Sequence, residues 1–483
     1  MRKATGGGAD APDRGPVGPV LHFRGLESGD VLLAALMAVC SGQPAPEVST
    51  ADGQAGHRLA ASMSNWDIHL YDMRLPRGGT ATYRADGIEY SVDTSYDDDL
   101  RVAFASCNGQ EHGDLDRDMR ERNAMWARLG EEHRAAPFQI LLHGGDQIYA
   151  DEATHAHPLS AGWPRDLPEV VDEDALEDLR ASLADAFAAR YLQLYAQPEF
   201  AYLAARVPSL AMWDDHDICD GWGSLKPPAL DSSIGRTLFA VARRAFLLFQ
   251  MAATSDRLPI ICDDPSGRSL GWQVALPGLR IIAPDLRSER RPDRVMGTNG
   301  WEAFRAALAA PAEPRTLILS SVPAIGPRLS LVESWMQRTP WFEKYEDDLR
   351  DQWQSHAHRT EWQDFLSASI ALHWRGSEIT FLSGEIHLAT RGTMATASGP
   401  IHQLVASGIA HPPPHWTYGA VLGLLARFGE APLKDHPLRL HPLPGRRSVY
   451  TAERNYLVLE RTQDAWTASW RLEDSGPTDP MPI

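Results

Sequence analysis

The sequence predicts an α/β protein with a layered sheet that carries helices, preceded by a small β-rich unit. Two observations lead to this prediction. From Leu100 onward, short apolar runs alternate with longer helical stretches, as expected where strands and helices follow one another. Before that point, apolar and polar residues alternate on both sides of a turn at Asp86-Gly87, which is typical of a hairpin. We therefore expect an N-terminal β-rich domain over residues 19–99 and an α/β domain over 100–483.

The N-terminal part contains three further features. Residues 1–18 are rich in Gly, Ala and Pro, which favours a disordered tail. The apolar run 31–39 is interpreted as a buried helix. A secretion signal is the alternative, but Glu27 and Asp30 precede the run where a signal needs a short basic start. Residues 65–70 form a further strand candidate.

The α/β part contains runs of the length of a buried strand and longer stretches of helical pattern. The predicted strands are 101–105, 138–142, 209–212, 279–283, 315–320 and 378–382, with a closing hairpin of 455–459 and 466–470. The predicted helices are 173–203, 234–253, 301–310 and 361–371. Residues 329–358 are long for a connection and rich in Trp and charge, so we expect a lid-like insertion there.

The composition excludes several classes of protein. Lys and Arg total 46 against 64 Asp and Glu, a formal charge of −18, so a nucleic-acid partner is not expected. No run approaches the roughly 20 apolar residues of a membrane span, so no membrane partner is expected. Four cysteines (Cys40, Cys107, Cys219 and Cys262) are too few for a disulfide scaffold, which favours the cytoplasm. The oligomeric state has no signature in the sequence.

Polar side chains follow four of the predicted strands at the point where each strand ends. In α/β sheets, functional sites assemble at the carboxyl ends of strands. We therefore expect these four segments to meet. They are Ser106-Cys107-Asn108 after 101–105, His143 to Tyr149 after 138–142, Asp214 to Asp217 after 209–212, and Ser383 to His387 after 378–382.

Such a gathering of carboxylates predicts a metal centre. Like charges a few ångströms apart oppose ionisation and folding unless cations compensate them. Oxygen ligands favour hard cations, whereas the sulfur of Cys107 and the phenolate of Tyr149 would favour Fe³⁺. Two ions that share one carboxylate would suit an in-line displacement at a phosphoester, because they polarise its oxygens and activate water.

In this order, the motifs SCNG, GGDQIYADE, WDDHD, DLRS and SGEIH resemble those of the alkaline phosphatase D family, the PhoD-like metallophosphatases of the metallophosphoesterase superfamily. The resemblance covers roughly residues 100–410. It implies a four-layer, metallophosphoesterase-like β-sandwich flanked by helices, with a small β domain before it. It also implies hydrolysis of a small phosphodiester or phosphomonoester by a binuclear centre.

The resemblance implies roles for nine residues. One ion, similar to Fe³⁺, would be held by Cys107, Asp146, Tyr149 and His387. Asp146 would bridge to a divalent ion (Ca²⁺, or Mn²⁺, Mg²⁺ or Zn²⁺), which would also use Glu385 and either Asp215 or Asp220. His216 would contact the phosphate or protonate the leaving oxygen, and Arg287 would pair with the phosphate.

The sequence departs from the family at three positions. Glu385 replaces an Asp, Asp220 stands where Asn is common, and Asp217 replaces a Glu. These changes make an alternative credible: a non-catalytic, metal-binding descendant with a structural or partner-binding role. A metal hydrolase acting on another bond, such as an amidase or lactonase, is a third reading. Arg287 has a structural alternative too, as a salt-bridge partner of Asp285 or Glu289.

Overall fold

The computed structural model describes residues 15–168, 171–327, 351–427 and 429–483. These described residues form three sheets, of eleven, seven and four strands, together with helices. The α/β class predicted from the sequence is confirmed. Residues 1–14 of the expected tail and residues 329–350 of the expected insertion lie outside the described residues, while Val17 and Gly18 already belong to the first strand.

The eleven-stranded sheet is built around four parallel strands. β9 (Leu100–Ala105), β10 (Ile140–Gly144), β11 (Ser209–Met212) and β1 (Val17–Glu27) lie side by side in this order. The sheet continues beyond β1 and beyond β9 in antiparallel strands. These are β2 (Asp30–Cys40), β5 (Gly56–Ser62) and β6 (Trp66–Pro76) on one side, and β19 (Asn455–Thr462), β20 (Ala465–Leu472), β21 (Gly476–Pro477) and β22 (Met481–Pro482) on the other.

Two expectations for the N-terminal part are corrected by this sheet. The run 31–39, interpreted as a buried helix, is strand β2, paired on both sides with β1 and β6. A strand with both faces buried is apolar throughout, so its pattern resembles that of a buried helix. The expected boundary near residue 99 also does not separate two sheets, because β1 pairs with β11 through His22 and Ser209.

The predicted hairpin at Asp86-Gly87 is present in the four-stranded sheet. β7 (Thr80–Ala85) and β8 (Ile88–Asp93) pair in antiparallel register from Thr80 with Asp93 to Ala85 with Ile88. β3 (Val48–Thr50) and β4 (Gly53–Gln54) complete this sheet.

The seven-stranded sheet also has a parallel centre. Its parallel strands are β13 (Leu279–Ala283), β14 (Arg315–Ser320), β15 (Glu378–Ser383) and β17 (Ile401–Val405). Antiparallel strands extend the sheet at its edges: β12 (Trp272–Leu276), β16 (Thr390–Met394) and β18 (Leu438–His441).

The two larger sheets pack together through buried tryptophans. The indole N–H of Trp470 donates to the carbonyl of Val405 at 2.8 Å, and that of Trp272 donates to the carbonyl of Ala211 at 2.8 Å. Each bond joins one sheet to the other, so each satisfies an indole that would otherwise be buried unpaired. The packing places the ends of β9, β10, β11 and β15 near one another.

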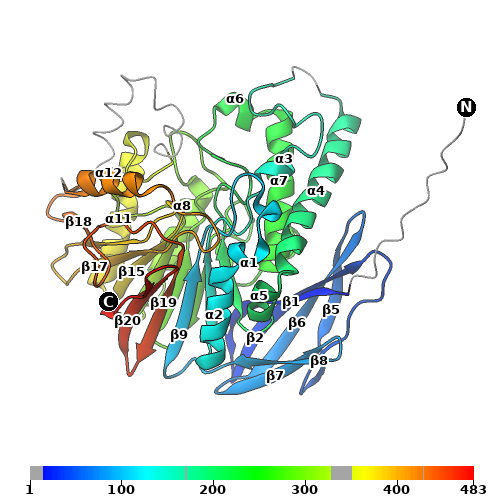
Figure 1. Cartoon of the computed structure of the whole chain (residues 1–483), viewed down its shortest axis with the longest axis horizontal. Coiled ribbons are helices and arrows are strands. Elements are labelled where there is room, and N and C mark those ends of the chain that lie inside the picture. The colour runs from blue at the N-terminus through cyan, green and yellow to red at the C-terminus, as the bar shows by residue number, and fades with distance from the viewer. Residues whose placement is uncertain (1–14, 169–170, 328–350, 428) are drawn as a thin grey trace, which may run out of the picture.

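Helices lie on both sides of the sheets (Figure 1). The cluster near the large sheet contains α2 (Ala124–Ala135), α4 (Glu173–Tyr195), α5 (Pro198–Ala204) and α7 (Ser233–Ala245). Near the seven-stranded sheet lie α8 (Thr298–Ala309), α11 (Arg359–Trp374) and α12 (Trp416–Ala426). Short helices are α1 (Met119–Arg122), α3 (Asp151–Thr154) and α6 (Pro227–Leu230), with 3₁₀ turns Asp114–Asp116 and His356–His358 and a π turn Phe246–Gln250.

The expected helix 173–203 is in fact two helices. Pro198 stands in the first turn of α5, where its missing N–H costs no intrahelical bond, whereas inside a continuous helix it would break one. The remaining expected helices match α7, α8 and α11 within a few residues at each end, with the π turn finishing the stretch predicted after 234.

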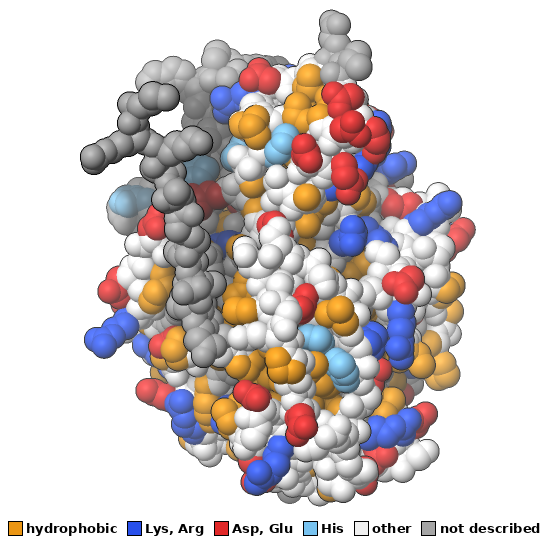
Figure 2. Space-filling view, turned by 90° about the vertical axis from the view of Figure 1, so that its right-hand side faces the viewer, with side chains coloured by type: hydrophobic (Ala, Val, Ile, Leu, Met, Phe, Trp, Pro, Cys, Tyr) orange, Lys and Arg blue, Asp and Glu red, His pale blue; other side chains and the backbone are white. Residues whose placement is uncertain are grey.

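The surface on the right of Figure 1 is seen face-on in Figure 2. Basic and acidic side chains are interspersed there, and acidic side chains gather near the top of the view. Within the described ranges, no helix combines the length and the apolar character needed to cross a bilayer.

Candidate metal centre

The four polar segments predicted from the sequence meet at the carboxyl ends of β9, β10, β11 and β15. Two glycines allow the close approach. A Cβ on Gly384 would lie 2.2 Å from Oγ of Ser106, and a Cβ on Gly145 would lie 2.7 Å from Cβ of Asp214. Gly145 also has a φ of +103°, which side-chain-bearing residues rarely adopt. Any larger residue at these two positions would separate the loops that carry the site.

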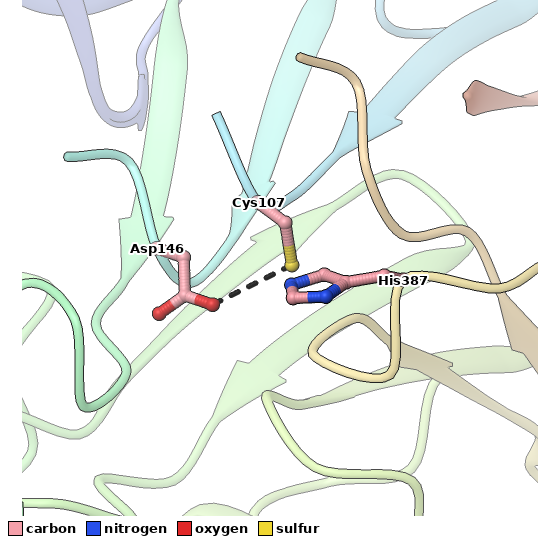
Figure 3. Close-up of side chains that lie close together, drawn as sticks. All are labelled: Cys107, Asp146 and His387. Atoms are coloured by element: carbon pink, nitrogen blue, oxygen red, sulfur yellow. Dashed lines mark hydrogen bonds between the residues drawn. The ribbon is translucent and has the colours of Figure 1, made fainter. Parts of the chain in front are cut away.

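The first candidate group comprises Cys107, Asp146 and His387, whose ligand atoms lie within 4.8 Å of one another. Figure 3 shows the three side chains converging from three separate segments, with the imidazole beside the sulfur. The thiol of Cys107 lies 3.5 Å from Oδ2 of Asp146 and 3.2 Å from Oγ of Ser407. The hydroxyl of Tyr149 lies 3.0 Å from Nε2 of His387, so it extends the same group.

The backbone at this group is in an uncommon conformation. Cys107, Asp146, Glu385 and His387 have φ values of 54°, 55°, 64° and 52°. Non-glycine residues in the left-handed region are uncommon, and residues held in this way cluster at functional sites. Three of these residues, Cys107, Asp146 and His387, form the first candidate group.

The second candidate group consists of Asp146, Asp214 and Asp215, and a third joins Asp215 and Asp220 to His216. Asp146 and Asp215 each belong to two groups, so one carboxylate could bridge two ions. Asp215 is held by its Oδ2, which accepts the backbone N–H of Gly221 at 2.8 Å.

Asp217 organises the backbone beneath these ligands. Its carboxylate accepts the N–H groups of Asp146 at 2.9 Å, Gln147 at 3.0 Å, Ile148 at 3.2 Å and Asp214 at 2.9 Å. It thereby joins the loop after β10 to the loop after β11 and fixes the spacing of Asp146 and Asp214. Asp217 is one of the three positions at which the sequence departs from the family. In the structure its carboxylate holds the two loops together.

The donor set fits metal ions. Buried carboxylate oxygens normally have hydrogen-bond partners, yet Oδ1 of Asp146, Oδ2 of Asp214 and Oδ1 of Asp215 accept no hydrogen bond from the described residues. Burial raises the pKa of the Asp146 carboxyl well above its usual value, and the neighbouring carboxylate of Asp214 raises it further. Burial likewise raises the pKa of Asp214 to about 6. Cations at these oxygens would remove both penalties.

His216 is held beside this group by Asp151. Its Nδ1 lies 2.9 Å from Oδ2 of Asp151, and its ring stacks on Tyr149 with centroids 4.2 Å apart. Burial by itself lowers the pKa of the imidazole, but Asp151 and Asp215 outweigh it and hold the pKa well above the usual value. His216 lines the cavity, and Asp151 occupies its Nδ1.

Arg287 does not lie where the resemblance implied. Its side chain is fully buried, and it pairs with Asp214 through Nε and with both oxygens of Asp351 at 2.9 and 2.5 Å. Its Nη1 also donates to the carbonyl of Trp222 at 3.2 Å. These bonds engage all three nitrogens, and Arg287 does not line the cavity. The alternative partners suggested by the sequence, Asp285 and Glu289, are not its ion pairs.

Glu385, expected to hold the second ion, faces a glutamine instead. Nε2 of Gln352 lies 2.7 and 2.6 Å from its two carboxylate oxygens. Glu385 lines the cavity but belongs to none of the three ligand groups formed by the described residues. Burial raises its pKa well above the usual value, and Asp351 and Asp214 raise it further.

The end of the expected insertion supplies part of the site. Asp351 and Gln352 lie within 329–358 and contact Arg287 and Glu385. Trp353, which lies within the expected insertion, is buried in the core: its indole donates to Ser320 at 3.1 Å and its ring stacks on Phe365. Trp335 and Trp341 lie outside the described residues.

Sequence reasoning missed several residues at the site. Asp151 stands in the GGDQIYADE motif but received no role, although an acidic residue in that motif was a usable signal. His411, also without a role, stacks on His387 with centroids 3.4 Å apart, and its Nε2 lies 3.3 Å from Oε1 of Glu111. Asp214, which has no role of its own in the sequence analysis, bears the Arg287 ion pair and an oxygen that accepts no hydrogen bond.

Comparisons with known proteins indicate the family of the chain. A family model described as PhoD related phosphatase matches residues 85–345. A curated Saccharomyces cerevisiae relative, named uncharacterized protein YGR266W, is 21% identical over 415 residues, covering 71% of this chain and 58% of the relative. The chain thus spans under two thirds of that relative's length.

Among solved structures, one titled "Structure of PhoD" is similar with a TM-score of 0.63 at 13% identity, covering 98% of this chain and 90% of the other. At that identity the likeness concerns the fold alone. The family match covers more than half of the chain and confirms the resemblance seen in the motifs. The protein belongs to the PhoD related phosphatase family.

Proposed function

We propose that the protein is a metal-dependent phosphoester hydrolase that acts on small phosphodiesters or phosphomonoesters through a binuclear centre. The observation that supports this most directly is the set of buried carboxylate oxygens on Asp146, Asp214 and Asp215 that accept no hydrogen bond from the described residues. Arg287 pairs with Asp214 and lies 3.4 Å from Oδ1 of Asp215, so a bound cation would compensate Asp146 and the carboxylate charge that Arg287 does not offset.

Two sets of residues would hold the ions. Cys107, Asp146, Tyr149 and His387 would hold an ion such as Fe³⁺, because sulfur and phenolate oxygen suit a strongly acidic metal. Asp146, Asp214 and Asp215 would hold a divalent ion, such as Ca²⁺, Mn²⁺, Mg²⁺ or Zn²⁺, with Asp220 and Glu385 at its margin. When bound, such a pair supplies Lewis acidity toward the phosphoryl oxygens and lowers the pKa of water.

The chain's own residues would supply the proton and the positioning. His216 is held protonated by Asp151, so Nε2 can donate a proton to the oxygen of the leaving group. Arg287 would act as a positioning residue, because its ion pair orients Asp214 toward the centre.

The proposal is tested by metal analysis together with hydrolysis of bis(p-nitrophenyl) phosphate and p-nitrophenyl phosphate. We expect the purified protein to contain about two ions per chain and to hydrolyse at least one ester. Asp146→Asn should lose one or both ions and activity, whereas Asp263→Asn, a partly buried aspartate outside the cavity, should keep both. A metal-free, inactive wild-type protein would contradict the proposal. Full metal loading without turnover on a broad phosphoester panel would instead favour the non-catalytic alternative.

A further inference from the structure

One helix beside the candidate metal centre has no charged residue. α12 (Trp416–Ala426) has the sequence WTYGAVLGLLA and lies at the upper left of Figure 1. A surface helix normally carries polar side chains on its solvent face. In α12, however, Val421 and Leu424 are 59% and 56% exposed.

This helix joins the loop that carries the candidate ligands. Leu422 is buried against Leu388 and Tyr450, in a small apolar cluster separate from the main core, and Ile386 packs on the same cluster. Ile386 stands between Glu385 and His387 in the chain. The apolar surface therefore begins one residue away from the candidate ligands and extends along α12.

The candidate metal centre and this apolar surface share one cavity of about 1700 Å³. Asp146, Asp215 and His387 line its polar end. One of its apolar walls is formed by α12 and its neighbours: Ile386, Tyr418, Val421, Leu422, Leu425 and Tyr450. From Tyr418 to Leu425 the helix rises about 10 Å, at about 1.5 Å per residue, so the wall is long enough to cover a chain of several carbons.

The charges that line the cavity select against polyanions. Among the described lining residues, Arg165 is the only Lys or Arg, against seven Asp and Glu. Bound cations would offset the carboxylates at the centre but would leave little positive charge for further phosphate groups. A phosphodiester, which carries a single negative charge, fits this cavity better than a nucleotide polyphosphate.

We propose that the substrate is a phosphodiester with a single charge whose one ester group is a hydrocarbon chain, held along the wall formed by α12. The inference rests on the proposed function, because it places the phosphoryl group at the metal centre. Burying a chain on this wall removes apolar surface from water on both partners, and that gain grows with each methylene.

The test compares p-nitrophenyl octyl phosphate with p-nitrophenyl methyl phosphate on the metal-loaded full chain, below the micelle concentration of the octyl ester. In both reactions a water oxygen bonds to phosphorus, the phosphorus–oxygen bond to p-nitrophenol breaks, and the alkyl phosphate remains. We expect kcat/KM to be on the order of 100-fold higher for the octyl ester, if about half of its seven extra methylenes are buried. Equal kcat/KM for the two esters would overturn the proposal.

The chain offers a matched pair of variants. Val421 lines the cavity, whereas Leu424 is equally exposed on the same helix but does not line it. Val421→Asp should reduce the octyl-to-methyl ratio of kcat/KM about tenfold or more, since a charge in the wall disfavours the chain. Leu424→Asp should leave the ratio within about twofold, and both variants should keep the wild-type melting temperature. Equal effects of the two variants on the ratio would contradict the assignment of the wall.

A binding measurement separates this inference from the proposed function. Titration calorimetry with octylphosphonate and methylphosphonate, neither of which is hydrolysed, should show tighter binding of the octyl compound and a loss of that preference in Val421→Asp. If this preference is found without hydrolysis of any ester, the assignment of the wall is supported and the proposed activity is contradicted. If hydrolysis is found without any chain-length preference, the proposed activity is supported and the assignment of the wall is contradicted. A Val421→Asp defect on phospholipid vesicles alone would assign α12 to membrane docking and overturn the inference.

Discussion

The carboxylate of Asp151 lies 2.9 Å from Nδ1 of His216, and its other oxygen accepts the backbone N–H of Asp220 at 2.7 Å. One side chain thus orients the imidazole, raises its pKa and fixes the loop that follows it. A carboxylate behind a catalytic histidine controls both the orientation and the protonation of the ring.

Replacing Asp151 by Asn should lower kcat/KM for p-nitrophenyl esters about 10- to 100-fold. Because the pKa of His216 falls when the negative charge is removed, the alkaline limb of the pH–rate profile should move to lower pH. Asp166→Asn, an exposed change in the same cavity, should leave the limb in place. A profile of Asp151→Asn that overlays the wild-type profile would exclude His216 as the acid.

Arg287 should prove essential for stability. Removing it in Arg287→Gln leaves the buried carboxylate of Asp214 without its cation and leaves that of Asp351 with Arg290 alone; breaking a buried ion pair in this way typically costs about 3–5 kcal/mol. Arg291→Gln is the control, because Arg291 pairs with Asp231 at the surface, and its loss should cost less than about 1 kcal/mol. Urea unfolding measures both. A phosphate-binding role for Arg287 would instead raise KM and leave the free energy of unfolding unchanged.

Tyr149 should give the metal-loaded protein a visible absorption band if the bound ion is Fe³⁺. Burial raises the pKa of its hydroxyl well above the usual value, so only a strongly acidic ion would ionise it near neutral pH. If that ion is Fe³⁺, the purified protein should absorb visible light, and Tyr149→Phe should remove the band while the fold remains. A colourless protein that contains iron would show that the phenol is not a ligand.

The buried carboxyls of the candidate metal centre should destabilise the metal-free protein as the pH rises. Burial raises the pKa of Asp214 and Asp220 to about 6 and that of Asp217 to about 7. Between about pH 4 and 7 these three carboxyls hold protons in the folded state that the unfolded chain has released, so their contribution to the free energy of unfolding falls with pH. His216, whose pKa is raised, acts in the same direction, whereas His387 and the buried histidines His133, His143 and His358, whose pKa values burial lowers, act in the opposite direction.

Bound cations should reverse this trend, because they favour the ionised carboxylates. The difference in melting temperature between metal-loaded and chelator-treated protein should therefore increase from pH 5 to pH 8. Calorimetry at four pH values measures it. A difference in melting temperature that stays constant or decreases from pH 5 to pH 8 would contradict the assignment of the raised pKa values.

The sequence by itself determined the mixed α/β class, the central strands and the family. The strands 209–212, 279–283 and 315–320 were predicted with the bounds that β11, β13 and β14 have. Such signals are local, because a short apolar run followed by a polar turn depends only on residues that are adjacent in the chain. The motifs at the strand ends identify the family for the same reason, because each consists of adjacent residues.

Only the tertiary structure decided which side chains meet. β2 became a strand because β1 and β6 flank it, and no local pattern records those neighbours. Arg287 lies in a buried ion pair with Asp351, 64 residues away in the chain, and Glu385 faces Gln352. Apolar burial brings such distant segments together without any periodicity in the sequence, and electrostatics then settles which charged groups pair and which carboxylates remain for a metal.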